Sequence, residues 1–269
     1  MLDILFWPFL AILIIAVIHA YLGLHVVKRG VIFVDLAMAQ MAALGTTFGF
    51  ILGLHPNRLP IFFMGLGFTM LGAAIFAILK TKNRQVPQEA IIGITYVVSA
   101  AMMLLLLSKL AEGSEHIDSL LVGSILFVTP IEVLKIFLPY LAIALILTLF
   151  HQKFSSLSQA YTDSRHLDRK ENVLNFLFYV IFGLVVTLSV KIAGVFLVFS
   201  YLIIPAVIAI MFTNSFKSNI ILSTSFSILG SIIGLWASVI LDIPTGASIV
   251  VSLGLMLVFT SGYKAARNW

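Results

Sequence analysis

Asp35 is the side chain whose position most strongly indicates chemistry, because it is an ionisable group inside a long apolar stretch, residues 31–54. A stretch of that length can cross a membrane as a helix, and an ionisable group within it is costly unless it faces a partner or a water-filled cavity. Gln40 follows five residues later. A carboxylate and an amide carbonyl suit a hard or borderline divalent cation. Asp35 and Gln40 therefore predict a site for a divalent metal ion.

The spacing of Asp35 and Gln40 leaves a second interpretation open. Five residues of a regular helix turn two side chains about 140° apart, so this pair shares a face only if the helix contains a π-type bulge. Asp35 would otherwise reach back to form an ion pair with Lys28 or Arg29, and Gln40 would bond to a neighbouring helix. The spacing alone is compatible with either arrangement.

Two histidines in the first apolar stretch, His19 and His25, are further candidates. They are six residues apart, so on one helix their side chains point in different directions and do not form a paired site. A single histidine in a membrane helix more often forms a hydrogen bond to another helix than it binds a metal. We expect that role for both.

Enzyme signatures are missing from the sequence. There is no His-Glu-x-x-His, no Gly-x-Ser-x-Gly and no Gly-x-x-x-x-Gly-Lys-[Ser/Thr] motif, and the chain contains no cysteine. Metalloprotease, serine hydrolase, nucleotide-hydrolysing and cysteine chemistry are therefore not indicated. We expect that the chain is not an enzyme, and that any ATPase driving it is a separate protein.

The candidate residues must be positioned by nine apolar stretches of about 17 to 24 residues, each long enough for a helix to cross about 30 Å of hydrocarbon. The composition agrees, with 61% hydrophobic and 10% charged residues and a mean hydropathy of +1.14. We predict an all-α, polytopic membrane helix bundle of about nine helices, with eight as the alternative, in a single domain of residues 1–269. The stretches are residues 4–27, 31–54, 59–79, 90–110, 131–150, 173–190, 194–212, 220–241 and 246–262.

Basic residues are distributed unequally between the gaps that separate these stretches. With the amino terminus outside and nine crossings, twelve of the sixteen Lys and Arg residues fall on the cytoplasmic side and three on the other. Cytoplasmic loops carry an excess of Lys and Arg, so this distribution predicts an outside amino terminus and a cytoplasmic carboxyl terminus. The net charge of +5 then reflects loops that face anionic lipid, and nucleic acid is not an expected partner.

Two polar segments are longer than the other connections. Residues 112–118 are acidic and precede an apolar run, 119–128, that is too short to span and is compatible with a re-entrant or surface helix. Residues 151–172 lie on the predicted cytoplasmic side and are long enough for an amphipathic helix against another protein. A hydrated connection is the alternative for each segment.

Small residues recur every four positions in two of the stretches, which predicts flat helix faces where another backbone approaches closely. They are Gly45, Gly49 and Gly53 in the second stretch, and Gly230, Gly234 and Ser238 in the eighth.

Four ordered segments resemble the permease subunit of the zinc/manganese/iron ABC uptake systems. The resemblance runs from about residue 20 to residue 255. It implies a homodimer of permeases, two cytoplasmic ATPase subunits and an extracytoplasmic binding protein that delivers a divalent metal ion, in a bacterial cytoplasmic membrane. The segments are KRGVIFVD (28–35) with AQMAALG (39–45), LVGSILFVTP (121–130), KIAGVFLVFSYLIIPA (191–206) and DIPTGASIV (242–250).

The resemblance also suggests roles for individual residues. The family usually has Asp, three residues and then His in the second helix, whereas here four residues separate Asp35 from Gln40, which stands where the His would be. An amide oxygen is a poorer zinc ligand than imidazole. The family's Ala-x-x-x-Gly element, which docks on the ATPase, corresponds to residues 164–168. The resemblance therefore implies a role in ATPase coupling for Asp163, Ser164, Arg165, His166 and Asp168. It implies a role in the pathway or its gating for Ser200, Tyr201 and Pro205. Pro205 lies mid-span and marks a kink or break.

We therefore expect the transmembrane subunit of an ATP-driven ABC importer for zinc or manganese. It would work by alternating access at a homodimer interface, with no permanently bound cofactor. The main alternative is a proton-coupled secondary transporter in which Asp35 and a membrane histidine form a relay; inverted internal repeats would favour it, and we find none that is convincing. An intramembrane enzyme is a third possibility, against which the missing motifs argue.

Overall fold

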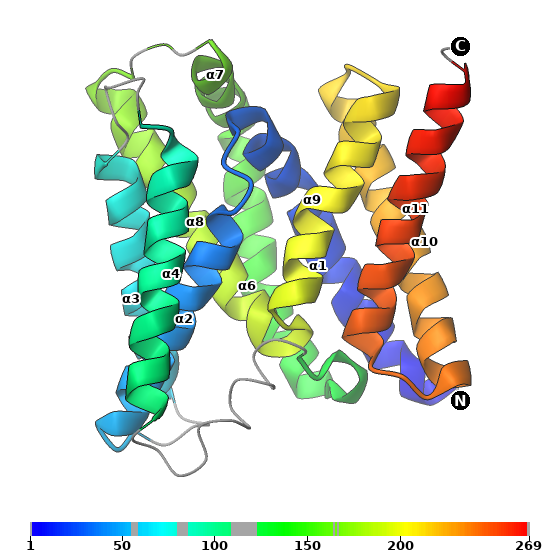
Figure 1. Cartoon of the computed structure of the whole chain (residues 1–269), viewed down its shortest axis with the longest axis horizontal. Coiled ribbons are helices and arrows are strands. Elements are labelled where there is room, and N and C mark those ends of the chain that lie inside the picture. Colours follow the sequence, from blue (N-terminus) through cyan, green and yellow to red (C-terminus); the bar gives the residue numbers. More distant parts are fainter. Residues whose placement is uncertain are drawn as a thin grey trace. The chain divides into compact units, whose positions relative to one another are not determined.

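The computed structural model describes residues 2–54, 59–79, 86–108, 123–163, 165 and 167–267. Within these ranges the chain is helical and contains no strand (Figure 1). The helices are α1 (Leu2–Arg29), α2 (Val34–Ile51), α3 (Leu59–Ile78), α4 (Gln88–Leu107), the 3₁₀ turn η1 (Ile125–Phe127), α6 (Pro130–Leu149), α7 (His151–Thr162), α8 (Arg169–Ala193), α9 (Val195–Phe212), α10 (Phe216–Leu241) and α11 (Thr245–Arg267).

Nine helices of the described ranges are long and apolar enough to cross a membrane, and α7 is not among them. The predicted all-α, nine-helix membrane fold is therefore confirmed. Several helices extend beyond their apolar stretch: α8 begins at Arg169, four residues before the predicted start, and α10 begins at Phe216. Hydropathy marks the part of a helix that lies in hydrocarbon, whereas the backbone hydrogen bonds continue into the polar region.

The helices form two compact units, each assembled from segments that are distant in sequence. The first unit takes the described residues of 1–27, 121–145 and 192–269, and the second takes those of 28–120 and 146–191. The first thus contains most of α1 together with α9, α10 and α11. The second contains α2, α3, α4, α7 and most of α8. A single permease domain over residues 1–269 stays a prediction.

In the second unit, α2 packs against both α3 and α4. A Cβ atom added at Gly45 would lie 2.6 Å from the carbonyl oxygen of Met64, and one added at Gly65 would lie 3.1 Å from that of Ala42. The backbones of α2 and α3 therefore approach closely, and the predicted flat face is confirmed at Gly45. It does not extend to Gly53, which lies beyond the end of α2 with a φ of 78°.

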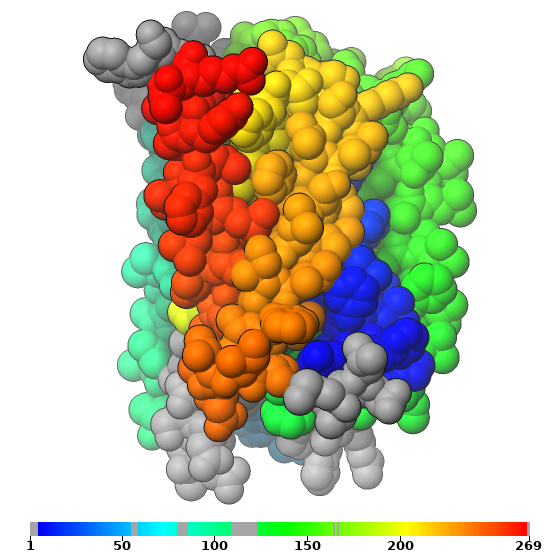
Figure 2. Space-filling model, turned by 90° about the vertical axis from the view of Figure 1, so that its right-hand side faces the viewer, coloured from blue at the N-terminus to red at the C-terminus, as the bar shows by residue number. Residues whose placement is uncertain are grey.

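In the first unit, α10 and α11 run side by side (Figure 2). A Cβ atom added at Gly234 would lie 2.5 Å from the Cα atom of Ile249, and the Ser248 hydroxyl donates a 2.8 Å hydrogen bond to the Gly234 carbonyl. This confirms the close approach predicted for the eighth stretch. Large apolar side chains such as Trp236 and Phe259 are exposed on the two helices, as expected of a surface that faces lipid.

The apolar run before α6 does not form the predicted surface helix in its described part. Residues 125–127 form only η1, and the Ser124 amide donates a 3.1 Å hydrogen bond to the carbonyl of Ile192. An added Cβ at Gly123 would lie 2.4 Å from the backbone of Ala193, so this segment is fixed against the turn between α8 and α9 rather than coiled as an α-helix. The acidic segment 112–118 and residues 119–122 lie outside the described residues.

Candidate functional site

The turn between α1 and α2 places Asp35 in the first turn of α2. Gly30 ends α1 with a φ of 65°, a left-handed conformation that glycine adopts without steric cost. The chain then returns through residues 31–33, and the amide of Val34 donates a 3.3 Å hydrogen bond to the carbonyl of Val31. A carboxylate in the first turn of a helix lies near unpaired amides and the positive end of the helix dipole. The turn thus places the Asp35 carboxylate beside the backbone amides at the start of α2.

Asp35 is buried, with 2% of its surface exposed, and its Oδ1 atom has no hydrogen-bond partner among the described residues. The alternative in which Asp35 pairs with Lys28 or Arg29 is not found. Lys28 is exposed, and the guanidinium of Arg29 is directed towards α7 and α8. A buried carboxylate oxygen without a partner is costly, and a bound cation would offset that cost.

Glu89, in the first turn of α4, supplies a second carboxylate that the sequence analysis missed. Its Oε1 atom accepts a hydrogen bond from the amide of Ile32, in the turn before Asp35. Its Oε2 atom is buried and has no partner in the described part of the chain. Because Ile32 lies three residues before Asp35, this bond brings the Glu89 carboxylate to the turn that leads into α2. The signal available in the sequence was a glutamate directly before the fourth apolar stretch.

Asp35 and Glu89 thus each keep one buried carboxylate oxygen without a partner, at the start of two helices, α2 and α4, that pack against each other. Two carboxylates suit a divalent cation such as Mn²⁺, which prefers oxygen ligands. The described residues contain no cluster of three or more His, Cys, Asp or Glu side chains that could hold a metal. Such a small ligand set favours transient binding, which is what passage of an ion requires.

Gln40 is not brought onto the same face as Asp35. Helix α2 is a regular α-helix from Val34 to Ile51, without the π-type bulge that a shared face requires. The Gln40 Nε2 atom donates to the sulfur of Met103 on α4, at 3.5 Å. This is the neighbouring-helix bond of the alternative interpretation, and the role of Gln40 as a metal ligand stays a prediction.

The two membrane histidines lie in the first unit, in different surroundings. The Nδ1 atom of His19 lies 2.8 Å from the carbonyl oxygen of Ile15 in its own helix, and its ring stacks on Tyr140 with 6.5 Å between centroids. His25 is fully buried and packs against Tyr21 and Phe216, with centroids 4.7 and 5.2 Å away.

The segment predicted to couple to an ATPase begins with an amphipathic helix, α7. Its residues Phe154, Leu157 and Ala160 are buried, whereas Gln152 and Lys153 are exposed. Burial raises the pKa of the Tyr161 hydroxyl above its ordinary value. This hydroxyl donates a 3.0 Å bond to the Oδ1 atom of Asn175 on α8. The helix expected within residues 151–172 is therefore present.

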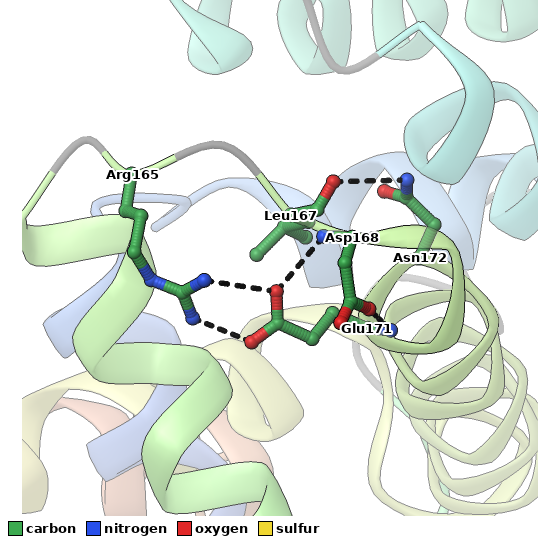
Figure 3. Close-up of polar contacts among 5 residues, drawn as sticks. All are labelled: Arg165, Leu167, Asp168, Glu171 and Asn172. Carbon is green, nitrogen blue, oxygen red and sulfur yellow. Dashed lines mark hydrogen bonds and ion pairs between the residues drawn. The ribbon is translucent and has the colours of Figure 1, made fainter.

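The residues after α7 form a capped start to α8 (Figure 3). The Asp168 carboxylate accepts a 2.7 Å hydrogen bond from the amide of Glu171, and the Glu171 carboxylate accepts a 2.9 Å bond from the amide of Asp168. This reciprocal arrangement is a capping box. Arg165 holds both carboxylate oxygens of Glu171, at 2.5 and 3.1 Å, and these hydrogen bonds raise the pKa of its guanidinium.

Three of the five predicted coupling residues can thus be placed. Arg165 and Asp168 belong to the capped turn, and Asp163 accepts a 3.0 Å hydrogen bond from Gln159 at the end of α7. Ser164 and His166 lie outside the described residues. The coupling role of all five stays a prediction.

A model of the family described as the ABC 3 transport family matches residues 1–264, nearly the whole chain. The chain belongs to the ABC 3 transport family. Its similarity to curated members extends over most of both sequences. It is 25% identical over 247 residues to the manganese import system permease protein ScaB of Streptococcus gordonii, covering 91% of this chain and 86% of that protein. It is 23% identical over 239 residues to the manganese transport system membrane protein MntC of Listeria monocytogenes, covering 88% and 82%.

A solved structure supports the fold of this ABC 3 family chain. The structure of PsaBC from Streptococcus pneumoniae in complex with Fab matches 96% of this chain and 90% of the other, with a TM-score of 0.76 and 24% identity. The family resemblance and the permease-type fold expected from the sequence are both confirmed.

The remaining pathway candidates of this ABC 3 family chain lie on α9, which continues as a helix through Pro205. A break at Pro205 is therefore not formed, and the alternative prediction of a kink there stays a prediction. The Tyr201 hydroxyl is buried and lies 2.5 Å from that of Ser231 on α10, whereas the Ser200 hydroxyl donates a 2.8 Å bond to the carbonyl of Phe196 in its own helix. Tyr201 therefore links α9 to α10, and a pathway or gating role for Ser200, Tyr201 and Pro205 stays a prediction.

Proposed function

We propose that this chain is the membrane-spanning subunit of an ATP-driven importer for a divalent metal ion, and that Asp35 binds the ion during passage. The observation that carries the proposal is the buried Asp35 carboxylate with its unpartnered Oδ1 atom. An unpaired ionisable group inside a membrane helix is a functional candidate by default. In a chain of a transport family, a cation that crosses the membrane is the simplest compensating charge.

Manganese fits the proposed site better than zinc. Asp35 and Glu89 offer oxygen ligands, Gln40 replaces the imidazole that zinc prefers, and the sequence contains no cysteine. The two curated relatives above are both named for manganese transport. Zinc remains the second candidate.

The proposed importer needs other subunits. The chain has no Gly-x-x-x-x-Gly-Lys-[Ser/Thr] motif, so ATP would be hydrolysed by a separate subunit that docks on α7 and the capped turn after it. A second copy of the permease would complete the pathway by alternating access, and an extracytoplasmic metal-binding protein would deliver the ion. The bacterial relatives support a location in the bacterial inner membrane. The distribution of Lys and Arg supports an outside amino terminus, which puts α7 on the ATPase side.

Reconstituted transport tests this function. The permease, its ATPase and its binding protein are placed in vesicles, and uptake of Mn²⁺ and Zn²⁺ is measured with ATP, without ATP and with a pH gradient alone. We expect Mn²⁺ uptake only with ATP, and faster than Zn²⁺ uptake. Uptake driven by the pH gradient without ATP would instead support the proton-coupled secondary transporter.

A further inference from the structure

The guanidinium of Arg29, at the end of α1, is enclosed by two other helices of the same unit. Only 6% of Arg29 is exposed. Its Nε atom donates a 2.9 Å hydrogen bond to the hydroxyl of Ser158 on α7, and its Nη1 atom donates a 3.3 Å bond to Asn175 on α8. Its central carbon lies 3.6 Å from the centre of the Phe178 ring. One side chain therefore joins the end of α1 to both α7 and α8.

Two further contacts strengthen this junction. The Tyr161 ring on α7 lies 5.3 Å from the Arg29 guanidinium, and the Tyr161 hydroxyl shares the acceptor atom of Asn175. The Thr162 hydroxyl, at the end of α7, donates a 3.0 Å hydrogen bond to the carbonyl of Lys28. The last turn of α7 is thus attached to the last turn of α1 through both a side chain and the backbone.

The junction lies directly before the turn that carries Asp35. Gly30 follows Arg29, and Asp35 is six residues from Arg29. Within this unit, α7 and the turn of residues 30–33 lie at the same end (Figure 1). The other side of the turn is held by Glu89, which accepts the amide of Ile32. The turn is therefore held at one end by α7 and α8 and at the other by α4.

We propose that Arg29 is a positioning residue that couples α7 to Asp35. A displacement of α7 would be transmitted through Arg29 and Lys28 to the turn of residues 30–33, and so to the carboxylate at the start of α2. This inference rests on the proposed function, in which α7 receives the ATPase. It gives Arg29 a role beyond that of one basic residue among those on the cytoplasmic side.

The chemistry of the junction requires arginine rather than any cation. A guanidinium is planar, so it can lie over the Phe178 ring at 3.6 Å while its edge nitrogens donate to two different helices. An ammonium group carries the same charge but has neither the flat face nor the fork of donors. Arg29→Lys therefore keeps the charge and loses most of the geometry, and Arg29→Gln loses both.

The test compares coupling in the reconstituted complex. Metal imported per ATP hydrolysed is measured for the wild type, Arg29→Lys and Arg29→Gln, with Lys217→Gln, an exposed cation at the start of α10, as the control. We expect both Arg29 variants to co-purify with the ATPase and to hydrolyse ATP within about twofold of the wild type, while metal imported per ATP falls about tenfold in Arg29→Gln. For Arg29→Lys, we expect a value of metal imported per ATP between those of the wild type and Arg29→Gln. The control should match the wild type.

A spectroscopic measurement separates positioning from general stabilisation. The chain has no cysteine, so spin labels can be attached at Ser156→Cys on α7 and Phe33→Cys in the turn without removing native thiols. With Arg29 present, we expect one narrow distance between the labels that is the same in the resting and ATP-trapped complexes. In Arg29→Gln, we expect the distance to differ between these two states.

Three results would overturn the inference. They are a normal coupling ratio in Arg29→Gln, a label distance that Arg29→Gln leaves unchanged in both states, and loss of ATPase co-purification in Arg29→Gln, which would make Arg29 a part of the docking surface itself. If Arg29→Gln does not fold, Ser158→Ala, which removes one bond of the junction, must show a smaller loss of coupling in the same direction. Failure of the wild type to import metal with ATP would contradict the proposed function, whereas the label distances test Arg29 independently of the metal.

Discussion

Single residues at the start of α2 and α4 show how a membrane helix can bury a carboxyl group without an ion pair. Glu89 uses one carboxylate oxygen to bind the amide of Ile32 and leaves the other without a partner, and Asp35 also keeps one oxygen without a partner. The turn is thus held by the same group that adds negative charge near Asp35. Removing the Asp35 carboxylate should affect metal uptake alone, whereas removing that of Glu89 can affect both metal uptake and the turn.

Asp35→Asn should fold and lose metal uptake. Asparagine keeps the size of the side chain and removes the charge that offsets dehydration of a cation. We expect uptake to fall about tenfold or more, which corresponds to about 1.4 kcal/mol of lost stabilisation of the ion. Uptake into vesicles is compared with that of Glu132→Gln, which neutralises a carboxylate in the first turn of α6. Wild-type uptake by Asp35→Asn at equal expression would remove Asp35 from the pathway.

Glu89→Gln should weaken metal uptake while retaining the turn. The glutamine carbonyl can still accept the amide of Ile32, so the turn should survive, whereas the second negative charge near Asp35 is lost. We expect a rise in the metal concentration needed for half-maximal uptake, measured with radioactive Mn²⁺. A substitution that cannot accept this hydrogen bond, Glu89→Leu, should in addition lower the melting temperature. Equal uptake by Glu89→Gln and the wild type would assign Glu89 to the turn alone.

Sequence reasoning found Asp35 because a lone carboxylate within an apolar stretch is visible in one dimension. It missed Glu89, which lies at the border of its stretch and reaches the turn before Asp35 only when α4 packs against α2. It treated Arg29 as one of twelve cytoplasmic cations and as an alternative ion-pair partner of Asp35, since its enclosure by α7 and α8 depends on residues more than a hundred positions away. Pairing between helices has no signature in a single sequence.

Among the elements, α7 differs from the spanning helices because one of its faces is polar and exposed. The capping box of Asp168 and Glu171 fixes where α8 begins, and Arg165 is joined to the same cap by its bonds to Glu171. A purely connecting segment could be exchanged at little cost, because closure entropy changes slowly with loop length.

Replacing residues 163–170 with a Gly/Ser linker of equal length should therefore leave the permease in the membrane and abolish its co-purification with the ATPase. ATP-driven uptake should be lost in parallel. Membrane localisation is checked by fractionation and docking by affinity capture of the ATPase. Normal transport by this variant would show that the segment only connects α7 to α8.

The approach of α10 to α11 gives a test of packing in the membrane. Gly234→Ala would place a methyl group against the backbone of Ile249, whereas Gly254→Ala on α11 meets no atom within 4 Å. Overpacking of this kind costs about 1–3 kcal/mol. We expect a lower melting temperature in detergent for Gly234→Ala and no change, or a small rise, for Gly254→Ala. Equal melting temperatures would mean that α10 and α11 can move apart without a loss of stability.

The elements themselves were largely predictable, because a spanning helix needs an apolar stretch of fixed length. The stretches gave nine helices and their order. Their ends were displaced where helices such as α8 continue into polar sequence, and the apolar run after residue 118 was misjudged because its described part is fixed by the backbone of Ile192. The length and hydropathy of the run cannot predict the hydrogen bond between Ser124 and Ile192.

For the whole molecule, the arrangement of charge predicts orientation. Reporter fusions after Arg84 and Trp269 should give a cytoplasmic signal, and a fusion after Glu112 should give an outside signal, because twelve of sixteen basic residues then face the cytoplasm. Alkaline phosphatase and a fluorescent protein, which are active on opposite sides, serve as paired reporters. An outside signal at Arg84 or Trp269 would reverse the topology and remove α7 from the ATPase side.

The two discontinuous units have a consequence for how the protein is made. Helix α1 is synthesised before α9, yet Gly23 packs against the carbonyl of Leu202 on α9, which is synthesised about 180 residues later. At about 5–20 residues per second, α1 waits roughly ten seconds or more for this partner. During that interval its buried face must be covered by lipid, the insertion machinery or a chaperone. Biogenesis should therefore be most vulnerable late in translation, and chains that stop before α9 should be targets for membrane proteases.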